Sequence, residues 1–212
     1  MKITTVEESI KQLATSYAER LRENIRNRIE EMKEDDNSHY LIYRVLGFSD
    51  EEGKLIDEYQ NVGRFLYKYV GGFLEEATML CFRHAFPEAK KHQVPNTKGL
   101  RPKNFGIDCL IGNRAYEIKW RDATTDGDHI IKEHTRAMVI KEHGLIPVRI
   151  MFYYPNREQS IRVQNAVRTL YESIGGEYYV GDDAWNYIHQ ITGIDLKNIL
   201  IRLVESNENN PG

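Results

Sequence analysis

The spacing of hydrophobic positions predicts two long helices in the first part of the chain. From Val6 to Met32 an apolar side chain recurs every three or four residues, which is the repeat of one face of an α-helix. The same repeat runs from about Glu58 to Ala85. The acidic segment 34–38 would end the first helix. The single apolar stripe of that helix either packs on its own domain or forms a dimer contact or a clamp around a ligand.

The pattern changes between residues 105 and 120, where it predicts a β-hairpin. Phe105–Ile111 and Arg114–Trp120 are rich in apolar, β-branched and aromatic side chains. Gly112-Asn113, which lies between them, is a dipeptide that closes two-residue turns. Because side chains alternate along a strand, Glu117 and Lys119 should point to the same face.

The rest of the chain alternates between helix and strand patterns. We expect a helix at 128–143 with Asp128 as its N-cap, a buried strand at 147–154, a helix at 158–174, a strand at 177–180, and helices at 185–192 and 196–204. This order predicts an α/β (α+β) fold, in which a mixed central sheet is flanked by helices and preceded by a long N-terminal helix. Residues 1–57 would form an N-terminal helical region that serves as a dimer or DNA-clamp arm, residues 58–205 the core, and residues 206–212 a disordered tail.

Composition excludes several classes of protein. Of the 212 residues, 41% are apolar and 29% charged, which is ordinary for a soluble globular protein and unlike a disordered one. The length fits one domain with additions, or at most two small domains. We find neither a membrane-spanning apolar run nor a secretory signal, so we expect a cytoplasmic protein with no membrane partner. Cys81 and Cys109 lack metal-site spacing and should be small buried hydrophobic residues.

The predicted hairpin carries three side chains suited to phosphodiester hydrolysis. Glu117 and Lys119 share a face, and Asp108 on the partner strand should reach the same end of the sheet. Two carboxylates can bind a hard divalent cation, and an ammonium group can lie beside the attacking water. The tripeptide Glu-x-Lys also occurs at 31–33, 52–54 and 88–90, but only the copy at Glu117 lies in an apolar strand pattern. The alternative is a solvated strand face with an ordinary ion pair.

One glutamate of the second long helix is a further candidate for the catalytic group. Glu76 borders the apolar face of the helix at 58–85, whereas Glu75 projects from the far side. We therefore expect Glu76 to reach inward and to add a third acidic side chain near the hairpin. A solvated Glu76 is the alternative.

A basic segment precedes the Asp108 strand. Residues 89–107 contain no acidic side chain, although the whole chain has a net charge of −3. Turn-forming residues within the segment predict a long loop. Lysine and arginine supply much of the binding energy for a phosphate backbone, so we expect Lys98, Arg101 and Lys103 to bind DNA. A soluble loop without a ligand is the alternative.

A polar segment follows the hairpin and offers donors and acceptors for base edges in the major groove. Its candidate DNA-binding residues are Arg121, Thr124, Thr125, His129, Lys132 and Arg136. Such residues favour a nuclease that recognises a base sequence over one that recognises only DNA structure.

These motifs together resemble the PD-(D/E)xK nucleases. The resemblance covers about Phe65 to Val204 and rests on a helix with a glutamate, the hairpin with its aspartate and Glu-x-Lys, and the helix, strand, helix and strand that follow. More narrowly, residues 105–109 and 117–122, with Trp185 and 192–195, are similar to type II restriction endonucleases of the ApaLI-like group. Ile107 stands where the family motif nominally has proline, a position that supplies no ligand.

The resemblance implies a type II restriction endonuclease that hydrolyses double-stranded DNA at a palindromic site, depends on Mg²⁺ and leaves 5′-phosphate ends. It implies that Asp108 and Glu117 hold the Mg²⁺, with the Ile118 carbonyl as a further ligand, and that Lys119 orients or polarises the attacking water. Since one motif serves one strand, we expect a homodimer. A cognate DNA methyltransferase is expected as a functional partner but not as a stable complex. The alternatives are a structure-selective or repair nuclease without base specificity, and a non-catalytic DNA-binding protein.

Overall fold

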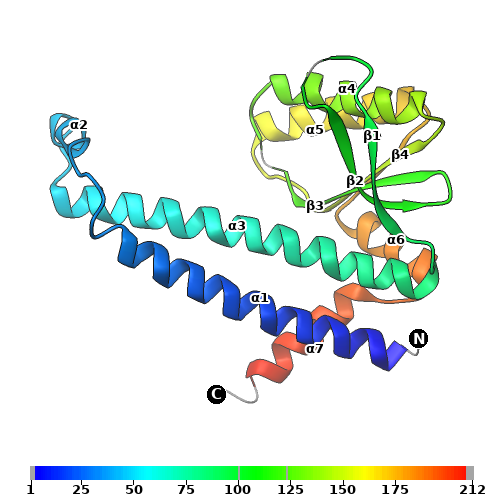
Figure 1. Ribbon diagram of the computed structural model, residues 1–212, viewed down its shortest axis with the longest axis horizontal. Coiled ribbons are helices and arrows are strands. Elements are labelled where there is room, and N and C mark those ends of the chain that lie inside the picture. Colours follow the sequence, from blue (N-terminus) through cyan, green and yellow to red (C-terminus); the bar gives the residue numbers. More distant parts are fainter. Residues whose placement is uncertain (1–2, 100, 123, 209–212) are drawn as a thin grey trace. The chain divides into compact units, whose positions relative to one another are not determined.

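The computed structural model describes residues 3–99, 101–122 and 124–208 of the chain (Figure 1). Its helices in these ranges are α1 (Ile3–Glu31), α2 (Tyr40–Val45), α3 (Asp50–Ala85), α4 (Asp128–Glu142), α5 (Glu158–Ser173), α6 (Asp182–Thr192) and α7 (Leu196–Glu208). Its strands there are β1 (Lys90–Pro95), β2 (Asn104–Ile111), β3 (Arg114–Arg121), β4 (Ile146–Tyr153) and β5 (Glu177–Val180). The mixed sheet, its helices and the long first helix confirm the predicted fold class. None of the described helices is both long and apolar enough to cross a membrane.

The chain divides into two compact units. The helical unit comprises residues 11–73, and the sheet unit comprises residues 1–10 together with 74–212. The division falls within helices α1 and α3, whereas the sequence suggested a boundary at residue 57. A continuous helix keeps the same backbone conformation throughout. Its sequence therefore gives no local signal of the residue at which one compact unit ends and the other begins.

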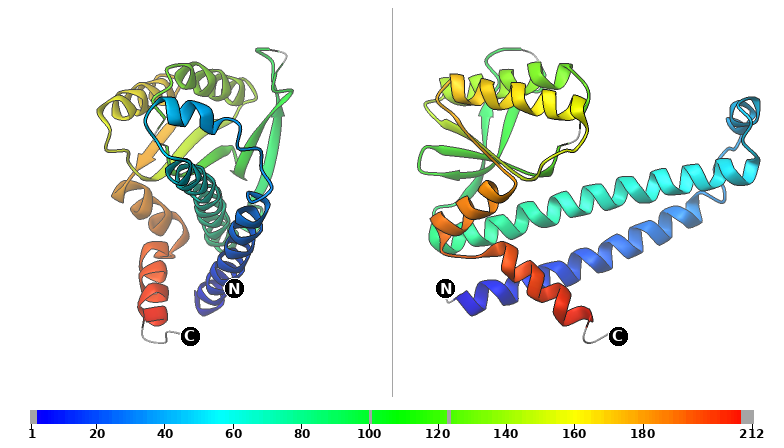
Figure 2. Two further views of the ribbon diagram at one scale, coloured as in Figure 1. Left: turned by 90° about the vertical axis from the view of Figure 1, so that its left-hand side faces the viewer. Right: turned by 180° about the vertical axis from the view of Figure 1, so that it is seen from behind.

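The helical unit pairs α1 with α3 (Figure 2). The Tyr17 ring meets the rings of Tyr69 and Phe73 edge-on, at centroid distances of 5.9 and 5.8 Å. Asn24 donates a hydrogen bond to the Tyr69 hydroxyl at 2.7 Å. Tyr17 of the α1 stripe therefore packs against α3 of the same chain, while the stripe positions from Leu13 to Met32 are half-buried.

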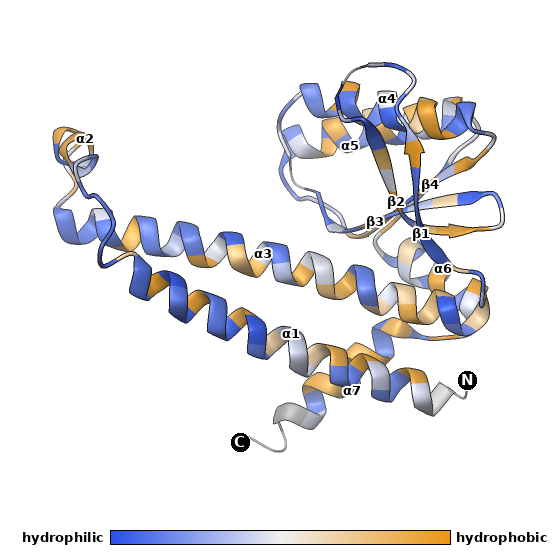
Figure 3. Ribbon diagram, viewed as in Figure 1, coloured by the Kyte–Doolittle hydropathy of each residue, from blue (hydrophilic) through white to orange (hydrophobic). Residues whose placement is uncertain are grey.

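Helix α2, which the sequence analysis did not predict, exposes its aliphatic side. Tyr40 is buried, and the Tyr43 hydroxyl donates a hydrogen bond to Asp57 of α3 at 3.0 Å. The opposite side is apolar (Figure 3) and consists of Leu41, Ile42, Val45 and Leu46, each more than half exposed. Leu41 and Val45 are four residues apart, as are Ile42 and Leu46, which places the two pairs on one side of a helical turn.

Helix α3 begins at Asp50, eight residues before the predicted start. Ser49 and Glu52 form a reciprocal cap, in which the Ser49 amide donates to the Glu52 carboxylate at 2.8 Å and the Glu52 amide donates to the Ser49 hydroxyl at 3.2 Å. Such a capping box satisfies two amides that a helix start leaves without partners. The sequence Ser-x-x-Glu at 49–52 is the pattern of a capping box and indicates this helix start. The apolar repeat from which the start was predicted becomes regular only from about Glu58.

The sheet has the strand order β1-β2-β3-β4-β5. Strands β1, β2 and β3 pair antiparallel, while β3, β4 and β5 pair parallel. Helices α4 and α5 cover one face, and α6 lies on the other (Figure 1). The α4 face encloses a core cluster of Val94, Ile107, Ala115, Val139 and Ile140.

The predicted hairpin is confirmed as β2 and β3. Gly112 has φ +55°, a left-handed conformation that glycine adopts without steric cost. Ala115 belongs to the α4-side core cluster, whereas the next side chain, Tyr116, meets the Phe82 ring at 4.8 Å on the opposite face. The alternation deduced for the second strand is therefore present, and it sends Glu117 and Lys119 to the α4 side.

The expectation of one long loop over residues 89–107 is wrong for its first part. Residues 90–95 form β1, an edge strand that pairs antiparallel with β2. Val94 is its only buried residue, so the strand has no apolar alternation. Charged side chains on an edge strand prevent pairing with other chains, and here they make the strand resemble a loop in sequence. Lys98, Arg101 and Lys103 do lie in the connection that follows.

Two further expectations need correction. The N-cap of α4 is Gly127, and Asp128 is the first residue of the helix; a carboxylate there still favours the helix because of the partial positive charge at its start. The predicted disordered tail began at residue 206, but α7 extends to Glu208. The remainder of that tail, 209–212, lies outside the described residues.

Candidate active site

Glu117 lies between two cations on the α4 side of the sheet. Its side chain is 7% exposed. The Lys119 ammonium is 2.6 Å from Glu117 Oε1, and the Arg136 guanidinium of α4 contacts Glu117 Oε2. Arg136 also donates a hydrogen bond to the Gly106 carbonyl of β2 at 2.7 Å. The predicted proximity of Glu117 and Lys119 is therefore observed, and Arg136 completes the group.

These charges determine the protonation of the pair. Burial alone would raise the pKa of Glu117, but Arg136 and Lys119 outweigh burial and hold that pKa at about 2. Burial would lower the pKa of Lys119, yet the Glu117 charge raises it above its usual value. At neutral pH the carboxylate is ionised and the ammonium keeps its proton.

A β-bulge places Asp108 beside this pair. In the β1–β2 register Lys90 pairs with Leu110 and His92 with Ile107, so one residue of β1 lies opposite two residues of β2. Bulges of this kind redirect a side chain and are common next to active sites. The Asp108 carboxylate accepts a hydrogen bond from the Ile118 amide of β3 at 2.8 Å. Asp108 thus reaches across to the strand that carries Glu117.

The pKa of Asp108 is raised, mainly because the carboxyl group is buried. Burial raises it to about 7, with a further increase from the charges of Glu117 and Glu75, while the Ile118 amide opposes the shift. A buried carboxyl group beside a second negative charge lies at a position where a bound cation would be favourable. Asp108 and Glu117 are therefore suited to hold a divalent metal ion.

Glu75 of α3 lies near enough to this group to raise the pKa of Asp108. The Glu75 side chain is 25% exposed and pairs with the Lys91 ammonium at 2.7 Å. Glu76 is an exposed residue. The exposure of Glu76 agrees with the solvated alternative that its sequence left open, and a catalytic role for Glu76 stays a prediction. The buried face of α3 near the sheet includes Thr78 and Phe82, which are three and seven residues beyond Glu75 and so on its side of the helix.

A second charged network adjoins the first. Arg149 on β4 pairs in register with Glu117 on β3 and is fully buried. Its guanidinium donates to Glu133 at 2.7 Å and to Asp122 at 2.6 Å. Asp122 also pairs with His129 at 2.8 Å. Because Glu133 and Arg136 are one turn apart on α4, two arginine–carboxylate pairs fix this helix to the sheet.

Several candidate DNA-binding residues are engaged within the chain. Arg136 is buried against Glu117, so the expectation that it reads bases is wrong. His129 pairs with Asp122, and the Arg121 guanidinium donates to Asn156 at 3.2 Å. Thr124 is half-buried.

The other candidates are accessible. Lys98, Arg101, Lys103, Thr125 and Lys132 are exposed residues. Lys98 forms an ion pair with Glu142, the last residue of α4. The exposed basic side chains of the β1–β2 connection remain suited to phosphate contacts.

Sequence reasoning missed Arg149 and Glu133. A signal was available, because Arg149 is the only charged residue in the apolar run 147–154. A charge in a buried strand requires a buried partner of opposite sign. Which partner it takes depends on the packing of α4 and could not be deduced from the strand.

The metal-binding capacity of the site is modest. Within the described ranges, no group of three or more His, Cys, Asp or Glu side chains is arranged to hold a metal ion. Mg²⁺ needs fewer protein ligands than this, because it usually keeps several waters and binds one or two carboxylates together with substrate phosphates. Cys81 and Cys109 are buried free thiols, as expected.

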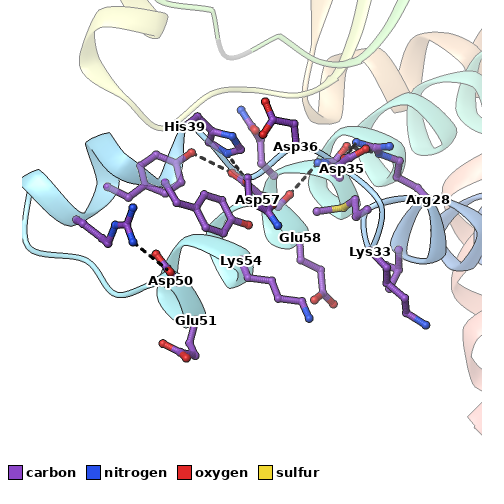
Figure 4. A pocket seen from close by; sticks show the side chains of 18 residues that line it. Arg28, Lys33, Asp35, Asp36, His39, Asp50, Glu51, Lys54, Asp57 and Glu58 are labelled. Carbon is purple, nitrogen blue, oxygen red and sulfur yellow. Dashed lines mark hydrogen bonds and ion pairs between the residues drawn. The ribbon is translucent and has the colours of Figure 1, made fainter.

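A separate hollow of about 870 Å³ lies in the helical unit (Figure 4). Its charged side chains are largely paired with one another: Asp57 with His39 at 2.9 Å, Arg28 with Asp35 at 2.6 Å, and Arg44 with Asp50 at 3.6 Å. These pairs occupy the groups that a ligand would need. The hairpin site is the better candidate for catalysis.

A comparison with protein families identifies the family of the chain. The model of the ApaLI-like restriction endonuclease family matches residues 1–205. No curated protein and no solved structure matches the chain. The match covers nearly the whole chain, including the hairpin, the helices that support it and the helical unit. The chain belongs to the ApaLI-like restriction endonuclease family, and it is thereby identified as a DNA endonuclease, a hydrolase.

Proposed function

We propose that this protein is a type II restriction endonuclease that hydrolyses double-stranded DNA at a palindromic site, requires Mg²⁺ and leaves 5′-phosphate ends. The observation that carries the proposal is the grouping of Asp108, Glu117 and Lys119 on one hairpin of a chain that belongs to a restriction endonuclease family.

Asp108 and Glu117 would hold the Mg²⁺, with the Ile118 carbonyl as a further ligand. When bound, the metal ion would neutralise charge that develops on the phosphate. The low pKa of Glu117 makes it a ligand at neutral pH without prior loss of a proton. Lys119 keeps its proton, so we assign it to orienting the attacking water by donating a hydrogen bond, and not to removing a proton from that water.

The exposed basic connection between β1 and β2 supports a role in DNA binding. We propose that Lys98, Arg101 and Lys103 contact phosphates, which position the duplex but carry no base information. Thr125 and Lys132 are exposed on the polar segment that follows the hairpin and are the candidates for base contacts. Arg121, Thr124 and His129 could contribute only if their internal partners are exchanged for DNA.

Metal removal tests the function directly. Cleavage of plasmid DNA should require a divalent cation and should stop in EDTA, because the site offers oxygen ligands and no Cys/His cluster for zinc. Calcium should support binding with little or no cutting. Gel electrophoresis and sequencing of the product ends would measure both cleavage and specificity. Undiminished cleavage in EDTA would exclude the metal role, and ends scattered over all sequences would favour a structure-selective nuclease.

A matched pair of substitutions should separate Glu75 from Glu76. Glu75→Gln should lower the cleavage rate at limiting Mg²⁺ by roughly tenfold or more, because it removes one of the negative charges that attract a cation toward Asp108. Glu76→Gln makes the same charge change one residue further and should stay within about twofold of wild type. Rates measured over a series of Mg²⁺ concentrations provide the comparison. The opposite ranking would restore Glu76 as the group that acts at the site.

We also propose a homodimer, because a chain with one such site must act twice to cut both strands of a palindrome. The α1 stripe is already packed on α3, so the contact would use another surface, and the exposed aliphatic face of α2 is a candidate. Light scattering should give a dimer. Val45→Gln with Leu46→Gln should weaken it, while Ile201→Gln with Val204→Gln, also exposed, should not. A strict monomer with and without DNA would contradict the dimer.

A further inference from the structure

Arg136 links the two strands that carry the acidic residues of the site. Its side chain is 10% exposed. One guanidinium nitrogen contacts Glu117 Oε2 on β3 and donates to the Gly106 carbonyl on β2 at 2.7 Å. Gly106 is two residues before Asp108. A single buried cation on α4 therefore sets the position of Glu117 relative to the strand that carries Asp108.

The two oxygens of Glu117 have different neighbours. Oε1 faces the Lys119 ammonium, whose side chain is 39% exposed, whereas Oε2 faces the enclosed Arg136 guanidinium. A lysine side chain is flexible and partly solvated, so an incoming cation can displace it at small cost. Displacing Arg136 would leave a buried guanidinium without its charged partner, which is costly. Oε1 is therefore accessible to a metal ion, and Oε2 is not.

One oxygen of Asp108 is also bound within the protein. Its Oδ2 accepts the hydrogen bond from the Ile118 amide at 2.8 Å. Each of the two carboxylates thus has one oxygen held by a partner fixed within the fold, while the other oxygen of Glu117 pairs with the displaceable Lys119 ammonium. Two metal ions about 3.5–4 Å apart need a bridging carboxylate or additional acidic ligands. Among the described residues, the structure brings Asp108 and Glu117 together but shows no group of three or more His, Cys, Asp or Glu side chains that could hold a metal ion.

We infer that Arg136 is a positioning residue that restricts the site to one divalent cation per chain, which Asp108 would hold together with Glu117 Oε1, the oxygen that faces the displaceable Lys119 ammonium. The guanidinium places a permanent positive charge on Glu117 Oε2, so this oxygen would not be offered to a second cation. A preorganised charge of this kind needs no rearrangement when the reaction occurs. This inference rests on the proposed metal-dependent nuclease function.

Mn²⁺ binding tests the inference without relying on cleavage. Electron paramagnetic resonance with the full-length chain should count one bound Mn²⁺ per wild-type chain. Arg136→Gln removes a charge that competes for Glu117, so Mn²⁺ should bind at least several-fold tighter. Cleavage at saturating metal should nevertheless fall at least tenfold, because Glu117 loses its fixed orientation. A merely structural role would weaken both properties together.

Two additional variants make the result decisive. Arg136→Lys keeps the positive charge and should return the Mn²⁺ affinity to near the wild-type value, and it remains informative if Arg136→Gln fails to fold in a thermal unfolding measurement. Lys141→Gln removes a charge from an exposed position of the same helix and should leave the Mn²⁺ affinity unchanged. Two Mn²⁺ ions per wild-type chain, or unchanged or weaker binding in Arg136→Gln, would overturn the inference while leaving the nuclease function intact. A wild-type chain that neither binds Mn²⁺ nor cuts DNA would remove the proposed function itself.

Discussion

Asp108→Asn should abolish DNA cleavage while leaving DNA binding intact. The amide keeps the shape of the side chain and its acceptor for the Ile118 amide, but it loses the charge that would hold the metal ion. Binding should tighten when metal is absent, because a carboxylate facing a phosphate repels it. Gel-shift and plasmid-cleavage assays measure the two properties separately.

The same variant should also be more stable than wild type in the absence of metal. The folded-state pKa of Asp108 is about 7, above the unfolded value of about 3.9. A carboxyl group with a raised pKa opposes folding once it is ionised, and this penalty grows as the pH rises from about 4 to 7. Asparagine has no such penalty, so the urea midpoint at neutral pH should increase. A site that costs stability for the sake of function is common.

Glu117→Gln and Lys119→Ala complete this test. Glu117→Gln should also abolish cleavage, but it leaves Arg136 and Lys119 without their shared carboxylate and should cost about 3 kcal/mol of folding free energy. Circular dichroism must therefore confirm that it folds. Lys119→Ala should lose cleavage on the order of a thousandfold.

The matched control is Glu31→Gln in another Glu-x-Lys triplet, on α1, where the Glu31 side chain is 67% exposed. It should cut at the wild-type rate. If folded Asp108 and Glu117 variants also cut at that rate, the assignment of the site is wrong.

Arg149→Met should lower the free energy of unfolding by about 3–5 kcal/mol. Arg149 is fully buried and donates to both Glu133 and Asp122. Methionine fills a similar volume, but the two carboxylates would remain enclosed without their cation. Urea denaturation followed by circular dichroism measures the loss.

Two comparisons identify the cause of that loss. Arg114→Met removes a guanidinium whose pair with Glu177 spans 2.9 Å but whose side chain is 45% exposed, so it should cost less than about 1 kcal/mol. Adding Glu133→Gln to Arg149→Met should recover part of the stability, because one buried carboxylate is then neutral. If the Arg149 and Arg114 variants lost equal free energy of unfolding, the buried network would stabilise the fold no more than an exposed ion pair.

Local patterns in the sequence were sufficient for the elements that position the site. The hairpin follows from two alternating runs around Gly112-Asn113, because turn type and side-chain alternation are decided within a few residues. The i, i+2 spacing of Glu117 and Lys119 on one strand already places both on one face. The long α1 helix and the buried β4 strand likewise follow from their own periodicity.

The errors concern features that depend on distant residues. β1 has no apolar alternation and becomes a strand only because β2 offers it hydrogen bonds. The orientation of Glu75 and Glu76 depends on which side of α3 packs near the sheet. The sequence predicted that Arg136 contacts DNA bases. Nothing in the sequence of its own helix shows that Arg136 packs against Glu117 of β3.

The sequence by itself therefore determined the order of elements, the hairpin and the candidate Asp108, Glu117 and Lys119, since each depends on short-range stereochemistry. Only the tertiary structure decided how these charges are compensated. It showed that Arg136 holds Glu117, that Arg149 binds Glu133 and Asp122, and that a bulge turns Asp108 toward β3. The physical reason is that a buried charge must find its partner in space, and that partner can lie anywhere in the chain.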